Sequence, residues 1–251
     1  MARRLIPIIF VWLAIVPARA APDEEAVRLY NEGAYEAAAE TAAAGGGTEN
    51  LALAARALNA AAYLSEDRRT ARIIFERAYD YAEVSIALDP NRVEGHLQAA
   101  ISLAQRGARM AGWRAFLLGL AQRARKEIDL ALEVNPGSAW ALSLSAGWHV
   151  EVARKGGAGT FGSDPELGRR QFLAAHQADS ENVAIAYECA LRLLAYGEPS
   201  WRADALWALE NAVSISPRNA FERAMRERAL ALAAAVEKGP EAEREFIDSH
   251  V

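Results

Sequence analysis

The sequence predicts an all-α protein: a solenoid of about five antiparallel helix pairs closed by a C-terminal capping helix. Alanine supplies 57 of the 251 residues, whereas aromatic residues make up only 8%. This composition favours helices, since alanine is the best helix former and strands prefer β-branched and aromatic side chains. Apolar residues also recur with a helical period through residues 23–249, and the same helix ending appears four times. An all-β fold is therefore excluded.

Residues 1–20 have the features of a secretory signal peptide. Two arginines precede an uncharged run over residues 5–16, and Ala18-Arg19-Ala20 has the small-x-small pattern of a cleavage site. Twelve apolar residues are too few to cross a membrane, which takes about 20. We expect cleavage after Ala20 and a periplasmic or secreted protein, with an uncleaved N-terminal anchor as the alternative.

The predicted helices of the mature chain share a recurring ending. Small or apolar residues stand at offsets of 4, 3 and 3 on one helix face, and a proline or serine follows two residues later. The four endings are Ala78-Ala82-Ser85-Leu88-Pro90, Ala124-Ile128-Ala131-Val134-Pro136, Gly168-Phe172-Ala175-Ala178-Ser180 and Ala205-Leu209-Ala212-Ile215-Pro217. The small side chains let a neighbouring helix approach closely, and the proline ends the helix.

These endings divide the chain into helix pairs, which are expected at residues 24–44, 49–89, 92–134, 138–178 and 182–215. A capping helix near 219–237 and a short acidic tail over 239–251 should follow. Because no pair can bury its own apolar face, each must stack on its neighbours, so we expect one repeat domain over residues 21–238.

The endings resemble those of the tetratricopeptide repeat (TPR), in which two antiparallel helices carry small and large residues at fixed positions. The resemblance covers nearly all of the mature chain. It implies a right-handed superhelix with a concave groove. The stop-to-stop spacings are 46, 44 and 37 residues instead of about 34, so the repeats should be irregular.

Two longer segments resemble particular families. The run from Trp113 to Pro136, with Gly147-Trp148-His149 after it, is similar to helices of the regulator of microtubule dynamics family, a divergent TPR group. The segment from Gly147 to Gly162 resembles uncharacterised exported bacterial repeat proteins. Neither resemblance brings an activity that can be assigned to this chain.

The run Gly157-Ala158-Gly159-Thr160-Phe161-Gly162 spells a dinucleotide-binding G-x-G-x-x-G. That motif needs a strand directly before it, and the preceding residues 139–154 have a helical pattern. We therefore expect an inserted loop over residues 156–164, which either is only a flexible connection or grips a ligand or partner.

No motif predicts an enzyme, a metal site or a cofactor. The histidines at 96, 149, 176 and 250 form no H-E-x-x-H pattern, and the single cysteine, Cys189, lies in an apolar helical run. Without residues 1–20 the chain carries 25 basic and 33 acidic residues, a net charge of −8. Such an acidic chain is a poor candidate for binding nucleic acid.

The charges are unevenly distributed. Residues 95–126 carry six basic side chains and no acidic one, whereas the segments on both sides are acidic. Within this stretch, Met110, Trp113, Phe116, Leu117 and Leu120 follow a helical spacing. A basic amphipathic helix over 106–126 binds an acidic partner or an anionic membrane, or else its apolar face is core. Self-association with the acidic flanks is a further alternative.

Candidate binding residues follow from these patterns. Aromatic and arginine side chains make strong anchors in a concave groove, although tryptophans also fill core gaps. The candidates are Arg106, Arg109, Trp113, Arg114, Trp140, Trp148, His149 and Arg154.

The sequence thus favours an exported, non-enzymatic scaffold that binds an exported or membrane protein in its groove. A periplasmic carrier or transporter accessory protein, enclosing a small molecule between the inner helices and the 156–164 loop, is the alternative.

Overall fold

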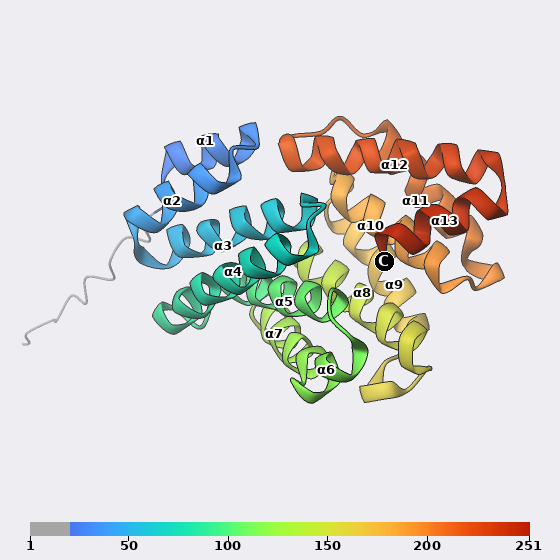
Figure 1. The fold of residues 1–251 in the computed structure, drawn as a ribbon, viewed down its shortest axis with the longest axis horizontal. Helices are drawn as coiled ribbons and strands as arrows, with labels where there is room; N and C mark the ends of the chain where they lie inside the picture. Colours follow the sequence, from blue (N-terminus) through green and yellow to red (C-terminus); the bar gives the residue numbers. More distant parts are fainter. Residues whose placement is uncertain (1–20) are drawn as a thin grey trace, which may run out of the picture.

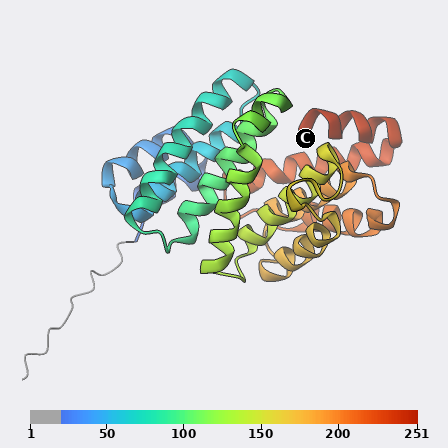
Figure 2. The ribbon, with the colours of Figure 1, turned by 90° about the horizontal axis from the view of Figure 1, so that it is seen from below.

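A computed structural model describes residues 21–251, so the predicted signal peptide lies outside the described part (Figure 1). The described residues form thirteen α-helices and two short 3₁₀ turns, with no strand among them. The all-α prediction is confirmed, and Figure 2 shows the N-terminal pairs on one side and the C-terminal pairs on the other.

The five expected helix pairs are present. They are α1 (Glu24–Glu32) with α2 (Tyr35–Gly45), α3 (Gly47–Leu64) with α4 (Arg68–Leu88), α5 (Val93–Ala108) with α7 (Leu120–Val134), α8 (Ala139–Gly156) with α9 (Pro165–Ala178), and α10 (Val183–Tyr196) with α11 (Arg202–Ser214). The capping helix is α12 (Ala220–Lys238). The 3₁₀ turns are η1 (Thr160–Gly162) and η2 (Pro199–Trp201).

The small residues of the recurring endings allow close helix packing. Ala78, Ala82 and Ser85 of α4 are fully buried. Gly168 of α9 packs so closely on α8 that a Cβ placed on it would lie 2.9 Å from the Ala146 carbonyl oxygen. The second helix of each pair therefore sits directly on the first.

The basic amphipathic helix expected over 106–126 is interrupted. After α5 ends, the chain forms the short helix α6 (Gly112–Leu117), and Gly119 at φ 58° separates α6 from α7. Because the left-handed backbone at Gly119 turns the chain, Phe116 and Leu117 do not share a helix face with Leu120. Leu120 is core, whereas Phe116 and Leu117 are exposed.

The expected acidic tail is instead a helix, α13 (Pro240–His250). Proline suits the first position of a helix, and Gly239 at φ 115° supplies the turn out of α12. Ile247 is buried in the core that α13 shares with α10 and α12. Because most side chains of this segment are acidic or polar, its composition does not indicate that Ile247 is buried.

The superhelix closes on itself at a seam where α1 and α3 meet α12. The seam consists of Asn31, Gly33 and Tyr63 on one side and Ala220, Phe221, Arg223 and Arg228 on the other. Arg223 Nη2 lies 3.5 Å from the Asn31 carbonyl oxygen, and the rings of Tyr63 and Phe221 meet edge to face at 5.9 Å. Figure 1 shows α1 and α12 next to each other along the upper edge. The inner faces of the first helix pairs and of the capping helix therefore border one shared space.

Candidate binding groove

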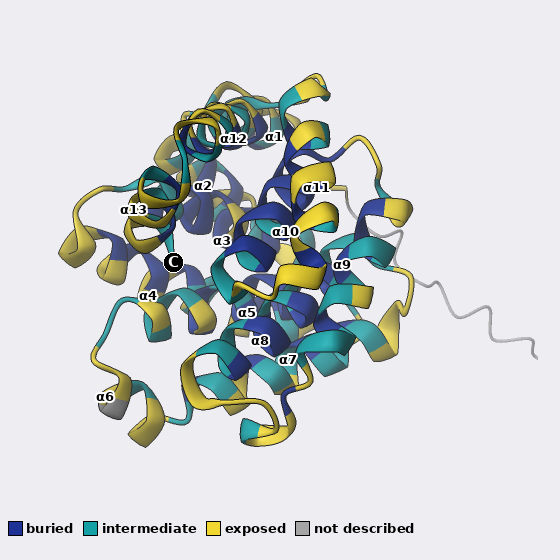
Figure 3. Ribbon diagram, turned by 90° about the vertical axis from the view of Figure 1, so that its right-hand side faces the viewer, coloured by how far each residue is buried: buried dark blue, intermediate teal, exposed yellow. Residues whose placement is uncertain are grey.

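The inner faces of the superhelix line a cavity of about 900 Å³, here called the inner groove. Residues of α3, α5, α8, α10 and α12 form most of its wall, and α6 and η1 contribute at one end. Figure 3 shows much of α5, α8 and α10 buried, α12 partly exposed and α6 exposed. A cavity of this size is large enough for a ligand or a short polypeptide segment.

One part of the wall is apolar. It lies where α5, α7 and α8 meet, and its members are Leu97, Ile101, Leu103, Leu120, Ile128, Leu144, Trp148 and Val152. Several of these side chains also belong to the core beneath the groove. This part of the wall can bind apolar groups through burial of surface.

A hydrogen-bonded polar network, which ends in the Arg56–Glu94 ion pair, lies on the wall between α3 and α5. The Asn59 amide Nδ2 donates to Gln98 Oε1 at 2.9 Å, and Ser102 Oγ donates to Asn59 Oδ1 at 2.8 Å. Gln98 Nε2 donates to Glu94 Oε1 at 2.8 Å, and Arg56 Nε donates to the same oxygen at 2.7 Å. Because each buried polar group has a partner, this network fixes the two helices relative to each other.

A charged cluster crosses the groove and brings together segments far apart in the sequence. Arg192 Nε donates to Glu188 Oε2 at 3.1 Å, and Arg192 Nη1 lies 3.6 Å from Glu151 of α8. The Tyr63 hydroxyl donates to Glu188 from α3, 125 positions away. Arg228 of α12 lies over the Tyr63 ring, 5.0 Å from its centre. The cluster thus connects α3, α8, α10 and α12.

The electrostatics of the cluster keep the Glu151 carboxylate ionised. Burial raises the pKa of Glu151, but the hydrogen bond from Arg154 and the charges of Arg192 and Lys155 outweigh burial and lower it to about 2. Burial and the neighbouring Glu188 raise the pKa of Tyr63 well above its usual value, so its hydroxyl remains a donor. The groove therefore holds fixed charges of both signs in a partly dehydrated wall.

Sequence reasoning missed Tyr63, Glu188 and Arg192. A signal was present, because Glu188 and Arg192 are the only charged residues of α10 and stand one helical turn apart. Charges that interrupt an apolar helix need partners from elsewhere in the fold. The sequence does not indicate which element supplies those partners.

Three of the predicted residues belong to the groove or its charged cluster. Trp140 is half-buried and lines the groove. Trp148 also lines it, but is mostly core: its indole Nε1 donates to the Ala121 carbonyl at 2.8 Å. Arg154 joins the cluster by donating to Glu151 at 2.7 and 2.9 Å.

His149 has a structural place beneath the groove. The Asp164 backbone N–H donates to its Nδ1 at 3.0 Å, which fixes the end of the 156–164 loop. Arg125 Nη1 lies 2.8 Å from its Nε2. Burial, then the charge of Arg125, lower the pKa of His149, so its ring stays neutral near pH 7.

The predicted residues of the basic stretch do not line the groove as a set. Arg106 Nη2 lies 3.5 Å from Glu76 of α4, and Arg109 packs over the Phe75 ring at 5.0 Å. Arg114 is exposed on α6. The backbone of Trp113 belongs to α6, and its side chain is outside the described part.

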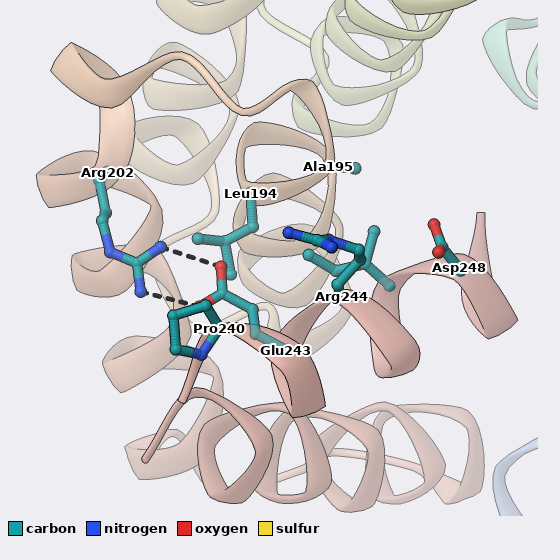
Figure 4. A pocket seen from close by; sticks show the side chains of 8 residues that line it. Leu194, Ala195, Arg202, Pro240, Glu243, Arg244 and Asp248 are labelled. Atoms are coloured by element: carbon teal, nitrogen blue, oxygen red, sulfur yellow. Dashed lines mark hydrogen bonds and ion pairs between the residues drawn. The ribbon is translucent and has the colours of Figure 1, made fainter. Parts of the chain in front are cut away.

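A second hollow of about 470 Å³ lies between α10 and α13. Figure 4 shows Arg202 reaching Glu243 across its edge, with nitrogen–oxygen distances of 2.9 and 2.8 Å. Arg244 and Asp248 also line the hollow, which has about half the volume of the inner groove.

The described residues show no group of three potential metal ligands, and Cys189 is buried. Burial raises the pKa of the Cys189 thiol to about 12, which keeps it protonated and unreactive. In the same part of the chain, no helix combines the length and the hydrophobicity needed to cross a bilayer.

Comparisons with known proteins agree with the repeat architecture. A thermophilic TPR protein of Thermus thermophilus superposes with a TM-score of 0.59 at 18% identity, over 82% of this chain and 95% of that one. At this identity the likeness shows the fold alone. No curated protein matches the sequence. The family described as Regulator of microtubule dynamics protein 1-3 matches residues 23–237. With most of its length matched, the chain belongs to this family of TPR-like proteins.

Proposed function

We propose that this protein is an exported, non-enzymatic scaffold that binds a polypeptide segment of another exported or membrane protein in its inner groove. The TPR-like fold is generally a scaffold for protein interaction, and this supports the scaffold part of the proposal. The charged cluster in the groove wall supports binding of a polypeptide there, because a polypeptide presents both hydrogen-bond donors and acceptors to such a cluster.

Binding would combine two kinds of contact. Apolar side chains of the segment would bury against the α5–α7–α8 wall and Trp140. Polar groups of the segment would exchange hydrogen bonds with Glu188 and Arg192, which are already held in place by each other. Such preorganised partners reduce the entropy lost on binding.

A second candidate is a carrier of a small apolar or anionic molecule. The seam favours it, because contact between α1 and α12 closes one side of the groove and shields part of it from solvent. A polypeptide would need an open end of the groove or an opening of the seam, whereas a small molecule needs only a transient gap.

Purification from the native compartment, followed by mass spectrometry of peptides and small molecules, separates the two candidates. The variant A104W blocks the groove, since Ala104 is an exposed residue of its wall. L230W is the matched control, because Leu230 is exposed outside the groove. The scaffold predicts a co-purifying polypeptide that A104W removes and L230W retains. A stoichiometric small molecule with the same dependence would establish the carrier instead.

Export is a separate part of the proposal and rests on residues 1–20. N-terminal sequencing of the protein recovered from the periplasm or the medium is expected to begin at Ala21. Recovery of an uncleaved chain in the cytoplasm would contradict export.

A further inference from the structure

Four large apolar side chains project into solvent at one edge of the molecule. Phe116, Leu117 and Leu118 follow one another in and after α6, and Phe161 belongs to η1. Their exposed fractions are 63%, 72%, 52% and 44%. The Phe116 and Phe161 rings stack with their centres 6.0 Å apart. We call these four residues the apolar tip.

Two connecting segments form the tip: the one that contains α6 and the one that contains η1. Gly119 at φ 58° turns the chain so that α6 stands apart from α7. Phe161 itself adopts φ 52°, the one described non-glycine residue with a positive φ. A left-handed backbone at a bulky residue costs free energy, and such strain is typically kept at functional positions. At Phe161 this backbone conformation places the side-chain ring against the ring of Phe116.

The two sequence segments that form the tip contain basic but no acidic residues. Residues 95–126 contain no acidic residue, and neither does the run 155–163. Exposed cations follow α6 on α7, at Arg123 and Lys126. Lys155, where α8 ends, is also exposed but pairs with Glu151 at 2.7 Å. The whole protein has a negative net charge, so the segments around the tip differ from the rest of the chain in carrying an excess of basic residues.

We propose that the apolar tip docks the protein on an anionic lipid bilayer. The four side chains would enter the interface between headgroups and acyl chains, and the cations would contact lipid phosphates. A protein partner fits less well, because a stable protein interface takes about 800 Å² from each side and four side chains supply much less.

Docking would fix the orientation of the groove. Phe116 and Phe161 line one end of the inner groove as well as the tip. Figure 1 places α6 along the lower edge of the molecule, away from the seam at the upper edge. That end of the groove would therefore face the membrane, and the seam would face away from it.

Co-sedimentation with vesicles tests the proposal. The full mature chain is mixed with vesicles of phosphatidylcholine alone or with phosphatidylglycerol. We expect binding to the anionic vesicles only, and a decrease with added salt. F116S/L117S should lose at least about tenfold in affinity. K126E should lose about fivefold or more, since a cation at an anionic surface contributes about 1 kcal/mol.

Two variants serve as controls. V84S/L88S removes exposed apolar side chains from α4, and K238E reverses an exposed charge at the end of α12. Both should bind vesicles as the unchanged protein does. Circular dichroism should show all variants folded, since every changed residue is exposed. Absence of binding to anionic vesicles, or equal losses in tip and control variants, would overturn the proposal.

Discussion

At the scale of single residues, the most informative group is the ion pair formed by Glu188 and Arg192. The Arg192 side chain is only 13% exposed, and its guanidinium faces carboxylates on both α10 and α8. Burying charges costs free energy, so the cluster persists because each member is paired. Removing Arg192 leaves the part-buried Glu188 carboxylate without its paired cation, whereas Glu151 keeps Arg154 and Lys155.

Replacing Arg192 by leucine should therefore destabilise the fold by about 3 kcal/mol, measured by urea unfolding. The matched control is R28L, which breaks exposed pairs with Glu25 and Glu32 on α1 and should change stability little. Equal small effects of both substitutions would contradict the structural importance of the cluster.

His96 provides a pH-dependent contribution to stability. Its Nδ1 lies 2.7 Å from Glu127 Oε2 and its Nε2 lies 2.9 Å from the Pro90 carbonyl, so both nitrogens donate when the ring is charged. The hydrogen bond with Glu127 raises the pKa of His96 above 6.5 despite its burial. Protonated His96 is thus favoured in the folded state.

The sign of the pH effect follows. Because the folded pKa is raised, the stabilisation is complete below pH 6.5 and is lost as pH rises through the folded value. The difference in unfolding free energy between the unchanged protein and H96Q should therefore be larger at pH 5.5 than at pH 8.5. Burial lowers the pKa of His149 and His176, an effect of opposite sign that cancels in this difference. A difference independent of pH would contradict the assignment.

At the scale of the elements, close approach of α8 and α9 depends on Gly168. A Cβ there would meet the Ala146 carbonyl oxygen and the Val150 side chain at 2.9 Å. G168A should cost about 1–3 kcal/mol in thermal or urea unfolding, because backbone must shift to relieve the clash.

Gly147 of α8 offers the matched control. A Cβ at Gly147 would meet only Phe172, at an ordinary 3.9 Å. G147A should leave stability unchanged or increase it by up to about 1 kcal/mol, since alanine is the better helix former. A destabilisation equal to that of G168A would show that the α8–α9 spacing is not what limits position 168.

The composition of residues 240–250 suggests a solvated tail, whereas the structure has a packed helix, α13. If residues 240–250 were a solvated tail, I247A would have no effect on stability. Because Ile247 is buried against the shared core, I247A should cost about 2–4 kcal/mol in urea unfolding. E245A on the exposed side of α13 is the control and should be nearly neutral.

At the scale of the whole molecule, the repeat pattern predicts the architecture because it is local. The prolines at 90, 136 and 217 end helices wherever the rest of the chain lies, and small residues such as Ala82 and Ala131 mark the packed faces. The groove, by contrast, depends on contacts between residues far apart in the sequence. Its charged cluster joins Tyr63 to Glu188, and its seam joins Asn31 to Arg223, across distances that no periodicity encodes. Trp140 and Arg154 were predicted from residue type, whereas the cluster that surrounds them depends on the superhelix closing.

Site-specific photo-crosslinking in the native cell tests whether the inner groove binds a polypeptide. A photoreactive residue is placed at Ala104 in the groove or at Leu230 outside it. We predict a discrete crosslinked polypeptide from position 104 and none from position 230. Absence of a crosslinked polypeptide at position 104, or the same products from both positions, would contradict the claim.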